Sequence, residues 1–316
     1  MSNMKFRRLG RTGLQVSEIG LGTVELGLEY GIAAEGTLRK PSRADAAHLL
    51  NQALDSGINF VDTARVYGVS EEIIGWALKS RRKEYILASK VTARGDANEG
   101  GGSLRTHLTS SVQESLRALQ TDVIDLMQVH SVSAGDIRRG ELADILQEFQ
   151  KAGSIRFLGA TTYGEEAALA ALEEGRYDCI QIAYNVLDRE PEASVLPLAQ
   201  SKDVGVVVRS VLLKGALTHR YYYLPGGLEE LKSAVERILA MAAAGSWSLP
   251  EFAYRFVLAH PAVSTALVGT AFVQELKAAV EYCARGPLTS QWQARARQVT
   301  IQDRSQLNPG NWRIEP

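Results

Sequence analysis

The sequence predicts an α/β protein in which eight parallel strands and their helices close into a single (β/α)8, or TIM, barrel. Short apolar runs alternate with segments of helical periodicity along most of the chain, and many runs are apolar at consecutive positions, as in strands buried on both faces. Eight such units in 316 residues suit one closed barrel, so we expect a single domain over residues 1–316. An open doubly wound sheet is the alternative, but no Gly-x-Gly-x-x-Gly pattern follows the first strand.

Each barrel unit is an apolar run followed by at least one helical segment. The first helix is expected to begin after Ser42, a typical N-cap residue, and to end at Gly57. The expected strands are 19–22, 58–61, 85–89, 123–129, 155–160, 178–183, 204–209 and 263–268. The other expected helices are 71–79, 105–119, 140–152, 165–174, 191–201, 228–243, 248–258 and 272–284.

The segments outside the eight units have patterns of their own. Two short runs, 5–8 and 14–17, flank a Gly-rich turn and predict an N-terminal β-hairpin. Residues 24–42 are rich in Gly and polar residues and predict a long loop. The C-terminal tail, 286–316, contains prolines and tryptophans, and we expect it to pack over one end of the barrel.

Composition argues against several kinds of partner. The formal net charge of −1 gives no reason to expect nucleic acid or an anionic membrane. The N-terminus lacks the apolar core of a signal peptide, and no run approaches about 20 consecutive apolar residues, so we expect a cytoplasmic protein with no membrane span. Cys179 and Cys283 are far apart in the sequence, which favours buried reduced thiols and gives no metal-ligand pattern.

Four polar residues mark the strand ends where chemistry is expected. In a (β/α)8 barrel the C-terminal ends of the strands converge on one mouth. Asp62, Lys90 and His130 close the second, third and fourth strands, and Tyr67 lies in the loop after the second. Singly, such residues are more often caps, solvated end charges or structural hydrogen-bonding groups. Their shared position at adjacent strand ends favours a common catalytic site.

These four side chains suit proton transfer to a carbonyl oxygen. A tyrosine phenol has a pKa of about 10, and a nearby ammonium group lowers that pKa. Asp62 would keep Lys90 charged and oriented, and His130 could orient a substrate oxygen by a hydrogen bond. The set contains no Ser or Cys nucleophile and no metal site, so a hydride would have to come from a bound cofactor.

The chain resembles the aldo-keto reductase family over about residues 5–285. The resemblance implies that Tyr67 is the general acid in reduction and the base in oxidation, that Lys90 and Asp62 tune it, and that His130 orients the carbonyl. The matching residues are Gly57, Asn59, Phe60, Asp62, Thr63, Ala64, Tyr67, Gly68, Ser70 and Glu71, then Ser115, Leu116, Leu119, Asp125, Leu126, Gln128, Val129 and His130, then Gly153, Ile155, Arg156, Leu158 and Gly159, and finally Gln181, Tyr184, Asn185, Val268, Gly269 and Thr270.

The same resemblance implies a nicotinamide cofactor, NAD(P)H, bound in extended form across the barrel mouth without a Rossmann fold. The nicotinamide is expected near Gly22 and Gln181, the pyrophosphate along the loop 210–215, and the adenosine end at residues 269–270. The full set of expected cofactor-binding residues is Gly22, Thr23, Thr161, Thr162, Gln181, Arg209, Ser210, Leu212, Lys214, Gly215, Gly269, Thr270 and Glu275.

The sequence departs from the family pattern at several cofactor positions. Residues 161–162 are both Thr where the family commonly has Ser-Asn, and Arg209 stands where many members place an aromatic ring under the nicotinamide. Its guanidinium plane could stack there. The segment 269–277 has no Arg for a 2′-phosphate, and Glu275 could instead accept a hydrogen bond from a free 2′-hydroxyl. We therefore expect tolerance of, or preference for, NAD(H), although Lys277 could favour NADP(H).

The resemblance predicts an oxidoreductase that interconverts an aldehyde, ketone or aldose with the corresponding alcohol or lactone. Two rival readings are an NAD-dependent sugar 1-dehydrogenase and a non-catalytic cofactor-binding regulatory subunit. Retention of all four catalytic residues argues against the second. We expect a small-molecule carbonyl or sugar substrate over Tyr67, His130 and Tyr30, and a monomer or weak homo-oligomer. Further aromatic wall candidates are Tyr221, Tyr222, Tyr223, Trp292 and Trp312.

Overall fold

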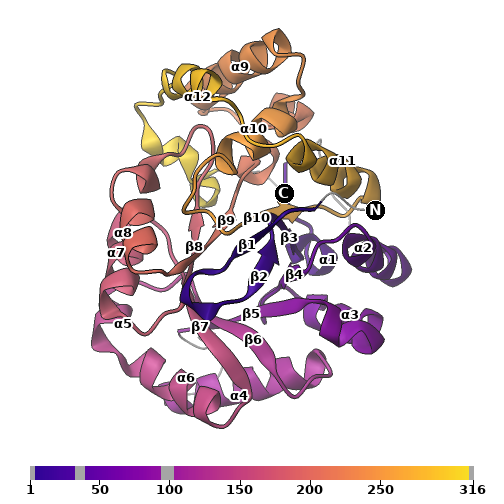
Figure 1. The fold of residues 1–316 in the computed structure, drawn as a ribbon, viewed down its shortest axis with the longest axis vertical. Helices are drawn as coiled ribbons and strands as arrows, with labels where there is room; N and C mark the ends of the chain where they lie inside the picture. Colours follow the sequence, from indigo (N-terminus) through magenta and orange to yellow (C-terminus); the bar gives the residue numbers. More distant parts are fainter. Residues whose placement is uncertain (1–3, 33–39, 94–102, 313–316) are drawn as a thin grey trace.

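A computed structural model describes residues 4–32, 40–93 and 103–312, and it confirms the (β/α)8 barrel (Figure 1). Eight parallel strands close in the order β10-β3-β4-β5-β6-β7-β8-β9. The strands are β3 (Ile19–Gly22), β4 (Phe60–Asp62), β5 (Ile86–Thr92), β6 (Ile124–His130), β7 (Ile155–Thr161), β8 (Cys179–Ala183), β9 (Gly205–Arg209) and β10 (Thr265–Gly269).

The helices surround the barrel as predicted, with end points shifted by a few residues. In the described part of the chain, four α-helices are capped by a serine hydroxyl that accepts a backbone N–H, namely those preceded by Ser42, Ser103, Ser133 and Ser248. The predicted helices are α2 (Arg43–Asp55), α3 (Ser70–Ala77), α4 (Leu104–Ala118), α6 (Glu141–Lys151), α7 (Glu165–Glu174), α8 (Val195–Ser201), α9 (Glu229–Ala244), α10 (Leu249–Val257) and α11 (Val273–Ala284).

Three α-helices were not predicted. The four residues of α1 (Val24–Gly27) lie in the segment 24–42 that was predicted to be a loop, of which residues 33–39 lie outside the described residues. The short helix α5 (Ala134–Arg139) ends at Gly140, whose left-handed backbone then leads into α6. In the tail, α12 (Ser290–Arg297) was not predicted because its sequence lacks the apolar stripe that marks a helix. It buries only Ala296.

The N-terminal hairpin is confirmed and closes the N-terminal end of the barrel. Strand β1 (Phe6–Arg8) pairs antiparallel with β2 (Gln15–Ser17), and the pair crosses the barrel in Figure 1. Leu9 and Val16 pack on inward-facing side chains of six barrel strands. These are Phe60, Ala88, Leu126, Cys179, Val207 and Leu267. Because this end is plugged by apolar side chains, an open cleft must lie at the other end.

The tail packs beside the last helices and reaches the mouth end of the barrel. Trp292 contacts Trp247 edge-on, with ring centroids 5.1 Å apart. Further along, Glu230 at the start of α9 accepts hydrogen bonds from the backbone of residues 302–303. Arg304 pairs with Asp188 in the loop after β8 at 3.5 Å. The tail therefore braces α9, α10 and one wall of the mouth.

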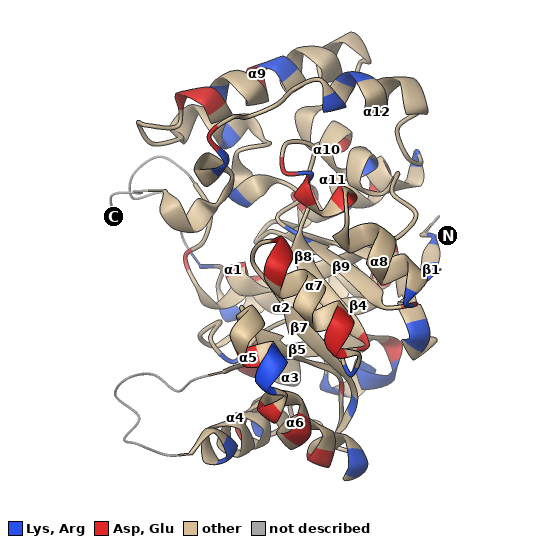
Figure 2. Cartoon of the chain, turned by 90° about the vertical axis from the view of Figure 1, so that its left-hand side faces the viewer, with Lys and Arg blue, Asp and Glu red and all other residues tan. Residues whose placement is uncertain are grey.

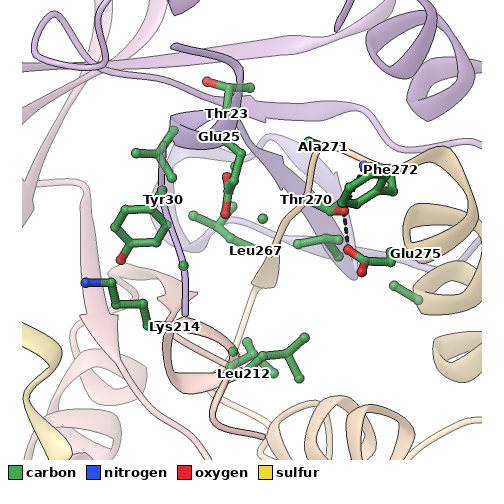
Figure 3. Close-up of a pocket in the computed structure, with 18 of the residues that line it drawn as sticks. Thr23, Glu25, Tyr30, Leu212, Lys214, Leu267, Thr270, Ala271, Phe272 and Glu275 are labelled. Atoms are coloured by element: carbon green, nitrogen blue, oxygen red, sulfur yellow. Dashed lines mark hydrogen bonds between the residues drawn. The ribbon is translucent and has the colours of Figure 1, made fainter. Parts of the chain in front are cut away.

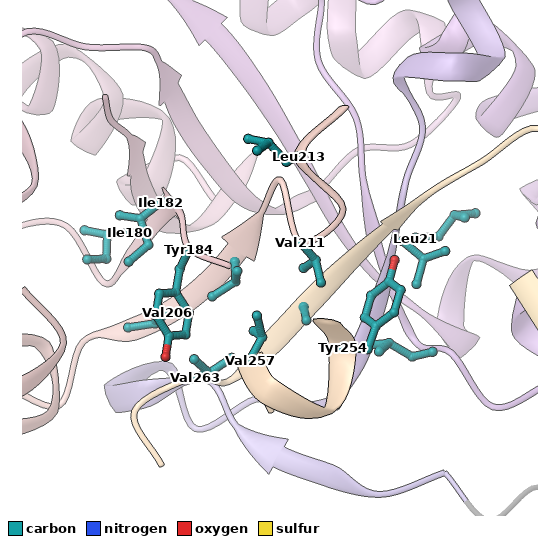
Figure 4. Close-up of a cluster of buried hydrophobic side chains, with 14 of the residues drawn as sticks. Leu21, Ile180, Ile182, Tyr184, Val206, Val211, Leu213, Tyr254, Val257 and Val263 are labelled. Atoms are coloured by element: carbon teal, nitrogen blue, oxygen red, sulfur yellow. The ribbon is translucent and has the colours of Figure 1, made fainter. Parts of the chain in front are cut away.

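The core continues from the barrel into the layer beneath the helices. Figure 4 shows side chains of β8 and β9 beside those of α10 in this cluster, which includes Tyr184 and Tyr254. Cys179 and Cys283 are both buried and unpaired, as predicted. In the side view of Figure 2, acidic and basic residues are interspersed over the outer helices. In the described part of the chain, no helix is both long and apolar enough to cross a membrane.

Candidate active site

The mouth of the barrel holds a cleft of about 1340 Å³ at the C-terminal ends of the strands. Asp62, Tyr67 and His130 line it, and Lys90 lies buried beneath them. The register of the sheet explains this convergence, because β5 pairs with β6 so that Lys90 lies beside Gln128. The structure therefore brings together the four residues that the sequence pattern singled out.

Asp62 and Lys90 form a buried ion pair at the floor of the cleft. Lys90 Nζ lies 2.5 Å from Asp62 Oδ2 and donates a second hydrogen bond to the Thr63 carbonyl at 2.8 Å. Both side chains are almost fully shielded from solvent. A buried ammonium group needs such partners, because taking a lone charge out of water is costly.

The second oxygen of Asp62 is held by two amides, one of which the sequence analysis did not assign to the site. Gln128 Nε2 donates to Asp62 Oδ1 at 3.0 Å, and Gln181 Nε2 donates to the same oxygen at 2.8 Å. Gln128 is fully buried in the middle of β6. The sequence signal for Gln128 was its position as a polar residue inside an apolar strand, since a buried amide requires hydrogen-bond partners. Asp62 is thus fixed by three donors.

Tyr67 reaches the cleft from the loop after β4. Its ring lies over Lys90, with Nζ 4.9 Å from the ring centroid, and it meets the His130 ring edge-on with centroids 5.8 Å apart. The loop is held by close backbone packing, because a Cβ on Gly27 would lie 1.7 Å from the Tyr67 carbonyl oxygen. Only glycine fits there, so α1 and the Tyr67 loop interlock without a side chain between them.

The charge states follow from burial and from the neighbouring cations. Burial raises the pKa of Tyr67, and Lys90 lowers it as predicted but offsets only part of that rise, so the net direction is upward. Burial lowers the pKa of Lys90, but Asp62 and Tyr67 raise this pKa by more than burial lowers it. The net direction is upward. Burial, with the positive charges of Lys90 and Arg209, lowers the pKa of His130 to about 3. At neutral pH the site holds a protonated phenol, an ammonium group and a neutral imidazole.

Most residues expected to bind cofactor line the same cleft. Thr162 is the exception: it is buried outside the cleft lining, and its hydroxyl has no partner among the described residues. Strand β7 ends at Thr161, and successive side chains point to opposite faces, so only the first of the two threonines faces the mouth. Those that line the cleft are Gly22, Thr23, Thr161, Gln181, Arg209, Ser210, Leu212, Lys214, Gly215, Gly269, Thr270 and Glu275.

The loop after β9 has the backbone shape of an anion-binding turn. Ser210, Leu213 and Lys214 all have positive φ, at 60°, 46° and 56°, and Gly215 follows at 106°. Left-handed backbone at non-glycine residues is strained and is found preferentially at ligand sites. Left-handed residues within a turn direct backbone N–H groups into a concave surface that suits phosphate. The strained backbone therefore marks this loop as a candidate ligand-binding segment, in which the N–H groups of Leu213 and Gly215 already donate to loop carbonyls.

Arg209 has a partner within the protein. Its guanidinium stacks on the ring of Tyr163, 4.0 Å from the centroid, and Nη2 donates to the Thr162 carbonyl at 3.0 Å. Tyr163 lines the cleft and had not been assigned to the site. The stacking surface expected of Arg209 is thus already engaged by a tyrosine, and the two side chains form one wall of the cleft.

Glu275 is neutralised by an arginine that the linear sequence does not place near it. Thr270 Oγ1 donates to Glu275 Oε2, as drawn in Figure 3, and Arg220 Nη2 donates to Oε1 at 3.1 Å. Arg220 belongs to a short 3-10 helix, η5 (His219–Tyr223), in the loop after β9. The segment 269–277 has no Arg of its own, but folding brings Arg220 beside it.

The aromatic wall residues divide into two groups. Tyr30 and Tyr223 line the cleft, and Lys214 Nζ lies 5.4 Å from the centroid of the Tyr30 ring (Figure 3). The rings of Tyr221 and Tyr222 stack on each other outside the cleft lining. Trp292 packs on Trp247 in the tail, and Trp312 donates to the Gln306 carbonyl, so neither tryptophan lines the cleft. The loop 93–103, which joins β5 to α4, falls almost wholly outside the described residues.

The barrel, the buried Asp-Lys pair and the Tyr-His face of the cleft together define an oxidoreductase site in a (β/α)8 protein. A sequence model described as "Aldo/keto reductase family" matches residues 18–301, and the chain belongs to this family. This family uses NAD(P)H, and its carbonyl-reducing chemistry is the general activity that membership supports.

Named relatives and a solved structure agree with this placement. L-galactose dehydrogenase of Arabidopsis thaliana is 32% identical over 291 residues, covering 88% of this chain and 87% of that protein. NADH-specific methylglyoxal reductase of Escherichia coli (strain K12) is 33% identical over 254 residues, covering 74% and 76%. The holo form of the aldo-keto reductase AKR11C1 from Bacillus halodurans has a TM-score of 0.79 and 31% identity, covering 95% of this chain and 99% of that one.

Proposed function

We propose that this chain is an NAD(P)(H)-dependent oxidoreductase that interconverts an aldehyde, ketone or aldose with the corresponding alcohol or lactone. It would act on CH–OH donors in the oxidising direction. The observation that carries the proposal is the buried Lys90–Asp62 pair, 2.5 Å apart, under a tyrosine ring that faces a neutral histidine across an open cleft. This arrangement provides a proton donor, a charge that stabilises its conjugate base, and an orienting hydrogen-bond donor.

Each of the four residues has a separate role in this proposal. A bound nicotinamide cofactor supplies or accepts the hydride. Tyr67 donates its phenolic proton to the carbonyl oxygen in reduction, and Lys90 stabilises the phenolate that remains. Asp62 keeps Lys90 charged and in place. His130, neutral at physiological pH because of its low pKa, orients the substrate oxygen through an imidazole N–H.

The cleft would hold the cofactor through residues at several strand ends. We assign the nicotinamide half to Gly22, Thr23, Thr161 and Gln181, and the pyrophosphate to the loop 210–215 with Lys214. The adenosine end falls to Gly269, Thr270 and Glu275. Arg209 and Tyr163 form the adjoining wall, and Tyr30 contributes to the substrate side. We further propose a cytoplasmic monomer or weak homo-oligomer.

Turnover of a generic carbonyl compound tests the proposal directly. We expect the purified protein to oxidise NADH or NADPH in the presence of 4-nitrobenzaldehyde, measured as loss of absorbance at the reduced-nicotinamide band. The reverse assay, with L-galactose and other aldoses plus NAD⁺ or NADP⁺, tests the sugar dehydrogenase reading that the Arabidopsis relative favours. Binding of a cofactor without turnover of any carbonyl or sugar would support the non-catalytic alternative.

We also propose that the enzyme accepts NAD(H) at least as well as NADP(H). Glu275 places a carboxylate at the proposed adenosine end, and the NADH-specific relative supports this preference. We expect kcat/KM with NADH to be within about tenfold of that with NADPH, or higher. Because Arg220 neutralises Glu275 in the structure, Glu275→Gln should free that arginine and improve the NADPH/NADH ratio by about tenfold.

The cofactor prediction has a matched control on the same helix. Glu281 is exposed on α11 and does not line the cleft, so Glu281→Gln should leave the NADPH/NADH ratio unchanged. A hundredfold advantage of NADPH in the wild-type enzyme would contradict the proposed preference. An unchanged ratio in Glu275→Gln would show that Glu275 does not set it.

A further inference from the structure

A carboxylate that the catalytic scheme does not use projects into the cofactor cleft. Glu25 is the second residue of α1, two positions after Thr23, and its side chain extends into the middle of the cleft in Figure 3. A Cβ built on Gly269 would lie 2.6 Å from Glu25 Oε1, so the carboxyl group lies directly against the end of β10. It therefore lies between the strand ends to which we assign the two halves of the cofactor.

One oxygen of the Glu25 carboxyl lacks the partners that the buried carboxylates Glu71 and Glu251 have. Its Oε2 atom is shielded from solvent and accepts no hydrogen bond from any described residue. By contrast, Glu71 pairs with Arg65 and accepts from Ser89, and Glu251 pairs with Arg255. A shielded carboxyl oxygen that accepts no hydrogen bond costs stability, so the position of this oxygen in the cleft indicates a role in ligand binding rather than in packing.

The surroundings of Glu25 favour its neutral form. Burial raises the pKa of Glu25 to about 7, and Glu275 of α11 adds to the rise, while a backbone N–H and Arg220 of η5 oppose it. Arg220 is itself paired with Glu275. The other titratable groups against it are two phenols, Tyr30 and Tyr254 of α10, whose pKa values burial raises, so both are neutral. Near neutral pH both forms of Glu25 are therefore populated.

We infer that Glu25 binds the nicotinamide cofactor as a protonated carboxyl group, so that cofactor binding takes up one proton at this residue. The inference rests on the proposed function, which places a dinucleotide in this cleft. The pyrophosphate of such a cofactor carries two negative charges, and a like charge nearby favours the neutral acid. A protonated carboxyl has an O–H donor to offer to a phosphate or ribose oxygen, which the carboxylate has not.

The direction of the pH dependence follows from this linkage. In the free protein Glu25 loses its proton as the pH rises through about 7, whereas in the complex it keeps the proton to higher pH. At alkaline pH, cofactor binding must then restore the proton to Glu25. The affinity for the cofactor therefore falls. The Kd of the cofactor should rise about fivefold between pH 7 and pH 8, and about tenfold for each further unit until the complex itself titrates.

Isothermal titration calorimetry with NADH tests the inference without relying on activity. NADH is the probe because the 2′-phosphate of NADPH titrates near pH 6 and would add its own proton. Titrations in two buffers of different ionisation enthalpy give the number of protons taken up. We expect about 0.1 at pH 6 and about 0.9 at pH 8 for the wild-type protein. Glu25→Gln, which is neutral at every pH, should lose this uptake and bind NADH about tenfold more tightly than wild type at pH 8.

A second carboxylate provides the matched control. Glu29 is exposed nearby and does not line the cleft, so Glu29→Gln should keep the wild-type proton uptake. His48 and His219 also line the cleft, and both are present in every variant. A difference in proton uptake between the variants therefore reports on Glu25 and not on these histidines. Equal uptake in wild type and Glu25→Gln, or negligible uptake in wild type at pH 8, would contradict the inference while leaving the proposed function intact. Failure of the wild-type protein to bind either NADH or NADPH would instead overturn the proposed function.

Discussion

Replacing Tyr67 by phenylalanine is expected to lower kcat for carbonyl reduction by at least about a hundredfold. The change removes only the hydroxyl, because the ring keeps its contacts with Lys90 and His130. Without the phenol the proposed proton donor is gone, and His130 cannot replace it because its own pKa is too low for it to act as an acid at neutral pH. The measurement is steady-state reduction of 4-nitrobenzaldehyde with saturating cofactor.

Binding and a neighbouring tyrosine provide the controls for Tyr67→Phe. The Kd for NADH should be unchanged, since the proposed cofactor contacts do not include the Tyr67 hydroxyl. Tyr30→Phe removes a second phenol from the same cleft and should change kcat by less than about tenfold, because this phenol, whose pKa burial raises to about 12, is not the proton donor of the proposed mechanism. Near-wild-type turnover by Tyr67→Phe would overturn the proposed mechanism.

Replacing Asp62 by asparagine is expected to affect stability as well as activity. The substitution keeps the shape of the side chain but leaves the buried Lys90 ammonium without its counter-ion, 2.5 Å away in the native site. Breaking one side of a buried pair costs about 3–5 kcal/mol. We expect a matching decrease in the free energy of unfolding, measured by urea titration, and a loss of most of the carbonyl reductase activity.

A double variant separates the two effects of Asp62. Asp62→Asn combined with Lys90→Met removes both charges and should recover part of the lost stability, while activity stays low because the phenolate has lost its cation. Glu84→Gln breaks an exposed pair with Arg81 and should leave the unfolding midpoint unchanged. If Asp62→Asn were as stable as wild type, the buried ion pair would not have the structural role assigned to it.

The strands and the convergence of the four proposed catalytic residues were predictable because both depend on local pattern. Apolar runs mark strands that are buried on both faces, and a polar residue at the end of such a run lies at the barrel mouth. Asp62, Lys90 and His130 could be placed together for this reason. The short helices α1 and α12 escaped the same reasoning, because neither has an apolar stripe long enough to be read as a helix.

The neighbours of the catalytic residues could not be predicted in this way. Arg220 reaches Glu275 across 55 positions of sequence, and Gln181 reaches Asp62 across 119. The net direction of the Tyr67 pKa could not be predicted either, since it depends on how deeply the phenol is buried and not only on which residue types are present.

The sequence by itself therefore determined the barrel, the family and the four-residue site that begins at Asp62 and Tyr67. These follow from periodicity and from a short motif, both of which are local properties of the chain. Only the tertiary structure decided the protonation states of Tyr67 and His130, the pairing of Arg220 with Glu275, and the position of an unpartnered Glu25 oxygen, Oε2, in the cleft. The physical reason is that burial and electrostatic balance are sums over groups from distant segments, and these groups meet only when the barrel closes.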